Sequence, residues 1–170
     1  MNVGEIIGLI LAVVIVIAVV VLVVVALRAT KVRWLDLPGH PGCKYGWRGA
    51  KGDVAVLVKA FEAASAAIRK HVSISPTTID AALSKSLIVV YPNPKVPNPS
   101  YPRILGAPAE VWGISWGQEV WVGSTYDALC HELCHSVFQS MGMAATDHSR
   151  FADLGAYAAI DEYTAARSNQ

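Results

Sequence analysis

The chain has 170 residues, of which 54% are hydrophobic and 16% charged, and its formal net charge is +1. This length suffices for one domain plus an appendage. Its 14 basic and 13 acidic residues form no Lys/Arg cluster of the kind that marks a nucleic-acid-binding surface, so we expect no nucleic-acid partner. Three cysteines, an odd number, exclude a disulfide framework and fit a reducing compartment.

The first predicted element is an uninterrupted apolar segment, residues 6–27, without a charged or polar side chain. As a helix rising about 1.5 Å per residue, it would span roughly 33 Å, the thickness of a bilayer core. A cleaved signal peptide fits less well, because its apolar region has only about 7–15 residues and follows a basic segment. We therefore expect residues 1–34 to form a membrane anchor, with the lipid bilayer as a partner.

The charges beside this segment predict its orientation. Arg28, Lys31 and Arg33 follow it, whereas only Glu5 and the terminal amine precede it. The positive-inside rule then places the C-terminal part in the cytoplasm. The expected localisation is that of a single-pass membrane protein with a cytoplasmic domain.

The rest of the chain is predicted to comprise a Gly/Pro-rich linker over residues 35–52 and one α+β domain over residues 53–170. Asp53 and Ser124 are predicted helix N-caps, Pro76 fits a first helical turn, and Gly142 fits a helix end. Prolines between residues 92 and 102 predict irregular structure up to about residue 105. In chain order, the expected elements are helix 53–71, helix 76–83, strand 87–91, a hairpin of strands 111–116 and 119–122, helix 124–142 and helix 147–167.

A metal-binding motif, His131-Glu132-Leu133-Cys134-His135, lies within one of these helices. Two histidines four residues apart project from one helix face and can bind one Zn²⁺. Glu132 lies about 100° round the helix from His131, where it can act as a general base on a water bound to the metal. Cys130 and Cys134 fall in the apolar arc of the helix, so we expect them to pack in the core. Covalent haem attachment would need the different spacing Cys-x-x-Cys-His.

A catalytic zinc has three protein ligands and one open position, so a third ligand is required. His148, thirteen residues after His135 and beyond the expected turn at Gly142, is the leading candidate. Asp147 and Glu162 remain rivals. On one regular helix His148 and Glu162 would lie about 21 Å apart, so they cannot share a metal.

The motif, about a dozen intervening residues, then His148 and the aromatic Phe151 resemble the core of the SprT-like zinc metalloproteases and, more broadly, the small single-domain zincins. The resemblance covers about 25 residues. It implies zinc binding by His131, His135 and His148, and a catalytic base at Glu132. Proteins of that family often carry a cysteine zinc ribbon after this core and are usually soluble. This chain differs in both respects, so a role in DNA repair is not carried over.

Other residues are candidates for supporting roles. Strand 119–122 is expected to be an edge strand that pairs with an extended peptide, and at least one of Trp112, Trp116 and Trp121 is expected to line the groove. Asp153 is a candidate for orienting a zinc-binding histidine. The candidates for stabilising negative charge in the transition state are Tyr157, Tyr163, Tyr126 and Arg150.

Together these features predict a membrane-anchored, zinc-dependent metallopeptidase with a zincin-like domain. In this hypothesis Zn²⁺ is the cofactor, Glu132 is catalytic, and the partner is a protein or peptide substrate near the membrane. One alternative is a catalytically inactive zinc-binding membrane scaffold or interaction domain. Another is an anchored structural domain without a metal.

Overall fold

The computed structural model describes residues 14–17, 19, 32–49, 51–101, 103–104, 106–144 and 148–168. The chain divides into two compact units, Met1–Val32 and Arg33–Gln170. The three histidines that could hold a metal ion belong to the second unit.

The structure contradicts two predictions, namely a transmembrane helix and a single-pass membrane protein with a cytoplasmic domain. Among the described residues, no helix is both long and apolar enough to cross a membrane. Within the predicted span, the described helical residues are 14–17 and 19; the rest of the span lies outside the described residues.

The second unit contains a mixed five-stranded sheet, which confirms the α+β prediction for this part of the chain. The strand order is β1-β2-β3-β7-β6. Strands β2, β3 and β7 are parallel, while the two outer strands, β1 and β6, run antiparallel to their neighbours. The bounds are β1 (Leu35–Asp36), β2 (Lys44–Trp47), β3 (Leu87–Val90), β6 (Gly113–Trp116) and β7 (Glu119–Val122).

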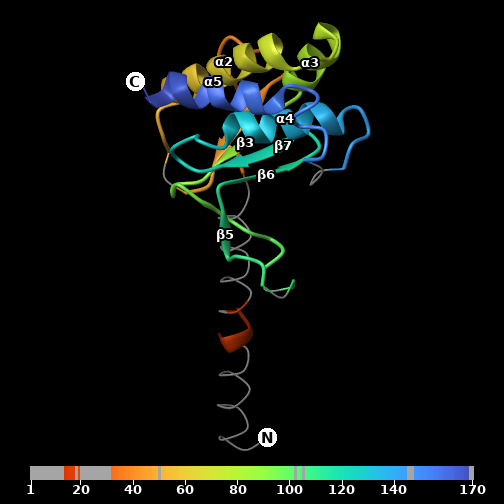
Figure 1. Cartoon of the computed structure of the whole chain (residues 1–170). Helices are drawn as coiled ribbons and strands as arrows, with labels where there is room; N and C mark the ends of the chain where they lie inside the picture. Colours follow the sequence, from red (N-terminus) through yellow and green to blue (C-terminus); the bar gives the residue numbers. More distant parts are fainter. Residues whose placement is uncertain are drawn as a thin grey trace, which may run out of the picture. The chain divides into compact units, whose positions relative to one another are not determined.

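Four helices lie on one side of this sheet (Figure 1). They are α2 (Val54–His71), α3 (Pro76–Leu83), α4 (Leu129–Gln139) and α5 (Ala156–Ser168). Helix α4 contacts β6 and β7 on one side and α2, α3 and α5 on the others. The core therefore surrounds α4, whose side chains Leu129, Leu133 and Val137 are completely buried.

Several elements agree with the sequence prediction because local signals determine them. Asp53 caps α2, and its carboxylate accepts a hydrogen bond from the Ala55 N–H at 2.8 Å. Helix α3 begins at Pro76, as a proline in the first turn predicts. The predicted hairpin is present as β6 and β7, joined by Gly117 with a φ of +60°.

Two segments expected to be irregular instead contain strands. The predicted linker, residues 35–52, contributes β1 and β2, and β2 pairs with β3 along its whole length. In the proline-rich segment, β4 (Val96–Pro97) pairs with β5 (Glu110–Val111) in a separate ladder. Local composition missed both because strand pairing depends on a distant partner, and a short edge ladder tolerates a proline.

Two helices begin later than predicted. Helix α4 starts at Leu129, without a side-chain cap, because Tyr126 has a φ of +57°, a left-handed conformation that an α-helix cannot include. Helix α5 starts at Ala156, after turns over residues 149–155. Gly155 has a φ of +78°, and a Cβ there would lie 2.1 Å from the carbonyl oxygen of His71. A close backbone contact with the end of α2 therefore fixes this start.

Candidate metal centre

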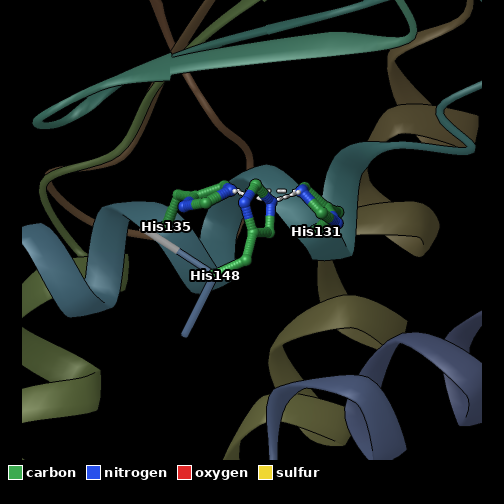
Figure 2. A group of neighbouring side chains, drawn as sticks. All are labelled: His131, His135 and His148. Carbon is green, nitrogen blue, oxygen red and sulfur yellow. Dashed lines mark hydrogen bonds between the residues drawn. The ribbon is translucent and has the colours of Figure 1, made fainter. Parts of the chain in front are cut away.

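Three histidine side chains converge beside α4. His131 and His135 project from the same side of α4, one turn apart, toward His148 in the segment between α4 and α5 (Figure 2). The three Nε2 atoms are mutually 3.1 Å apart. These three residues are close enough to hold a metal ion.

Hydrogen bonding among the imidazoles cannot satisfy this arrangement completely. The Nε2 of a neutral imidazole is either a donor or an acceptor, so at least one of the three pairs must bring two like groups together. A cation bound at this point would accept a lone pair from every one of the three nitrogens. The donor set therefore fits a metal better than it fits a hydrogen-bonded cluster.

Packing fixes the orientation of the imidazole rings. Phe151 is fully buried, and its ring centroid lies 5.3, 4.6 and 4.8 Å from those of His131, His135 and His148. Burial, and then the charge of His148, lower the pKa of His131. A lowered pKa favours the neutral imidazole, which is the form that binds metals.

The two cysteines beside these histidines pack in the core, as predicted. Cys130 and Cys134 are both completely buried. A hydrogen bond between the Cys134 thiol and Cys130, together with burial, raises the pKa of Cys134. Since a thiolate is the form that ligates a metal, this environment disfavours Cys134 as a ligand.

Glu132 lies against strand β6 and is only 6% exposed. A Cβ on Gly113 would stand 2.7 Å from Glu132 Cγ and 2.9 Å from its Oε1, so the carboxyl group occupies the space that this glycine leaves. Burial raises the pKa of Glu132 to about 8, and a hydrogen bond with Ser115 acts in the opposite direction. A divalent cation nearby would also favour the carboxylate.

The histidines and Glu132 line a common cleft of about 280 Å³. Strand β6 forms one wall through all four of its residues, Gly113–Trp116, and residues 98–100 and Val111 contribute further lining. The cleft therefore brings together three histidines that could hold a metal ion, a buried carboxyl group and the outer strand of the sheet.

The expected edge strand was misassigned. Strand β7 lies between β3 and β6, so both of its sides are paired, and β6 is the strand at the edge. The hairpin pattern could not decide which of its two strands would pair with β3. Among the three tryptophans, Trp116 lines the cleft, is 44% exposed and packs edge-on against Trp121 at 4.9 Å.

Of the two rival metal ligands, the structure describes Glu162. Glu162 on α5 contacts Lys70 Nζ at 2.5 Å and His71 Nε2 at 2.6 Å, and it does not belong to the histidine cluster. Asp147 lies outside the described residues.

None of the proposed supporting residues belongs to the cleft lining that the structure describes. Tyr157 is 46% exposed and packs against Phe151, while Asp153 is exposed in the turns before α5. Tyr163 is buried, and its hydroxyl donates to the Tyr126 carbonyl at 2.7 Å, which is a structural contact. In the part of the chain that the structure describes, the cleft lining includes none of these residues, nor Arg150.

Sequence reasoning missed Gly113 and Ser115, which line the same cleft as Glu132 from β6. Residues two apart on a strand face the same side, so their common side could be read from the sequence. That this side faces Glu132 depends on the packing of β6 against α4.

Comparison of the chain with protein-family models, with curated proteins and with solved structures found no match. Function must therefore be argued from the chemistry of the site itself.

Proposed function

We propose that this protein is a zinc-dependent metallopeptidase. The observation that carries the proposal is the convergence of three imidazole Nε2 atoms, 3.1 Å apart, in the same cleft as Glu132. Zn–N bonds of about 2.0–2.1 Å in a tetrahedral site separate the ligand nitrogens by about 3.3–3.4 Å. The nitrogens would therefore need to move apart by only a few tenths of an ångström.

The donor set favours zinc over other common cations. Mg²⁺ and Ca²⁺ prefer oxygen ligands, whereas imidazole suits borderline metals such as zinc. Three protein ligands leave one tetrahedral position open, which is the pattern of catalytic rather than structural zinc. His148 is exposed, so the site can be reached from solvent.

When bound, a zinc ion supplies Lewis-acid activation of water and of the scissile carbonyl. In this proposal Glu132 accepts the proton released by the attacking water and delivers it to the departing amine nitrogen. Its shielded position inside the cleft suits a group that holds a proton between these two events. This assignment makes Glu132 the residue on which hydrolysis depends.

The edge strand favours a peptide substrate. One side of β6 pairs with β7, and the other side is the edge of the sheet, where backbone N–H and C=O groups can pair with an added strand. Because β6 also lines the cleft, a peptide bound along it would lie beside the three histidines and Glu132. Ile114, Val111 and Trp116 provide apolar contacts for its side chains.

The test combines metal analysis with peptide hydrolysis by the full chain. The wild type should bind one zinc per chain and cleave unfolded casein in a reaction that chelators stop. Glu132→Gln should keep zinc and lose cleavage, while His135→Ala should lose both. Glu62→Gln, the same change at an exposed position of α2, is the matched control.

Absence of bound zinc would refute the proposal. Zinc without Glu132-dependent cleavage would instead support the inactive zinc-binding domain, since the metal site would then be intact and the chemistry missing.

A further inference from the structure

The side chains of β6 alternate between the two faces of the sheet. A Cβ on Gly113 would stand 2.7 Å from Glu132 Cγ, so residue 113 faces α4. Ser115 also faces α4, because its Oγ accepts a hydrogen bond from Gln139 Nε2 at 3.1 Å. The first and third residues of the strand therefore point toward the helix that carries the metal-binding motif.

The second and fourth residues of β6 form an apolar face on the other side of the sheet. Ile114 and Trp116 alternate with the first pair, so they share this face. Trp121 of β7 belongs to the same face, since it is paired with Ile114 in the ladder and its ring centroid lies 4.9 Å from that of Trp116. Ile114 is half-buried and Trp116 is 44% exposed, so both retain surface that a ligand can cover.

Contacts on both sides of this face hold it in place. Trp121 Nε1 donates to Glu119 Oε1 at 2.6 Å, and the ring centroid of Tyr91 lies 5.4 Å from that of Trp121. The turn that follows β6 is fixed to α4, because Ser136 Oγ donates to the carbonyl oxygen of Gly117 at 2.7 Å. A surface that is already ordered loses little conformational entropy when a ligand covers it.

Both faces of β6 border the cleft that contains the three histidines, since all four residues of the strand line it. A peptide added to the free edge of β6 keeps the alternation of a strand. One set of its side chains would lie beside Gly113 and Ser115, on the side of α4, and the other set beside Ile114 and Trp116. Apolar contacts are therefore available to every second side chain of the peptide.

We propose that this cleft selects extended peptide segments with large apolar side chains two residues apart, and that Trp116 and Ile114 determine this specificity. The two substrate side chains, at positions i and i+2, pack against Trp116 and Ile114 on the face away from α4. This inference rests on the proposed function, whose peptide substrate it specifies. Cleaved segments then have the apolar alternation of a β-strand and not the spacing of a helix.

The experiment uses the full-length, zinc-loaded chain and two terminally blocked peptides of identical composition. Both consist of alanine and serine with two phenylalanines, placed at i and i+2 in the first peptide and at i and i+1 in the second. In an added strand only the first peptide directs both phenyl rings to one face. We expect its kcat/KM to be about tenfold higher, the effect of one further aromatic contact.

Variants of β6 test which residues select the substrate. Trp116→Ala should bring the ratio of the two kcat/KM values close to 1 with zinc content unchanged, whereas Trp116→Phe should keep most of the ratio. Ile114→Ala should also lower the ratio, which gives a second test if Trp116→Ala does not fold. Trp112→Ala is the matched control and should keep the wild-type ratio, because Trp112 is 57% exposed but is not among the residues that line the described cleft.

Three outcomes would overturn the inference while leaving the proposed function intact. They are a wild-type ratio near 1, a Trp116→Ala variant that keeps the tenfold ratio, and a Trp112→Ala variant that loses it.

Binding provides a readout that does not need activity. If the wild type cleaves neither casein nor the two peptides, the proposed function fails. Fluorescence polarisation of the labelled peptides with the full chain then still tests the specificity of the cleft. Tenfold tighter binding of the first peptide that is lost in Trp116→Ala supports the inference, and equal or absent binding of the two peptides overturns it.

Discussion

Gly113→Ala tests whether the absence of a side chain at Gly113 on β6 determines the position of Glu132. A Cβ at residue 113 would lie 2.7 Å from Glu132 Cγ and 2.8 Å from Ala128 Cβ, whereas carbon atoms in contact are about 3.5–4.0 Å apart. Glu132 or β6 must therefore move by about 1 Å. A displacement of this size at a reacting group can lower the rate about 100-fold, and overpacking of this kind costs about 1–3 kcal/mol of stability.

The expected result for Gly113→Ala is a kcat reduced about 100-fold with bound zinc retained, because none of the three histidines is among the atoms that the new Cβ meets. The assay combines kcat, zinc content and the urea midpoint. Gly142→Ala is a control for stability alone, since its φ of +84° makes alanine unfavourable while the space around it is open. A Gly113→Ala variant with wild-type kcat, or one that has lost zinc, would refute the reasoning.

Three further predictions concern the metal and its surroundings. Burial raises the pKa of Glu132 from 4.5 to about 8, so its contribution to stability in the metal-free chain is present below pH 4.5 and is lost as the pH rises through 8. Glu132→Gln should therefore raise the free energy of unfolding of the metal-free chain, measured by urea denaturation, by a few kcal/mol at most at pH 9 and leave it nearly unchanged at pH 4.5. Equal changes at both pH values would contradict this. Zinc at 100–1,000 times its Kd should stabilise the wild type by about 2.7–4.1 kcal/mol, seen as a higher Tm that a chelator reverses. In His148→Ala most of that increase should disappear without loss of the apo fold, because His148 is exposed; an unchanged zinc effect would exclude it as a ligand. Phe151→Ala should cost about 3–5 kcal/mol and weaken zinc binding, because the buried ring packs against all three histidines; zinc affinity equal to wild type would show that the ring does not orient them.

Only part of the candidate site could be read from the sequence. The spacing of His131 and His135 places both on one helix face, because the helical repeat is a local property. The sequence left His148, Asp147 and Glu162 as rivals. The fold brings His148 to the other two histidines and pairs Glu162 with Lys70 and His71 instead.

The same division applies to the fold. Helices α2 and α3 are predicted correctly because caps and periodicity act within a few residues. The start of α4 was missed because Tyr126 adopts a left-handed conformation, which nothing in the residue type requires. The apolar segment 6–27 led to a membrane prediction that the described residues do not support.

The sequence by itself determined the chemistry that can meet at the site, namely two imidazoles one turn apart with a carboxyl group between them in the chain. Only the tertiary structure decided which strand is the edge, which residue completes the histidine cluster, and which residues of β6 line the cleft beside Glu132. The physical reason is the separation along the chain of the residues that interact. Helical spacing and capping depend on neighbours along the chain, whereas the strand order and the packing of β6 on α4 depend on pairings between distant segments.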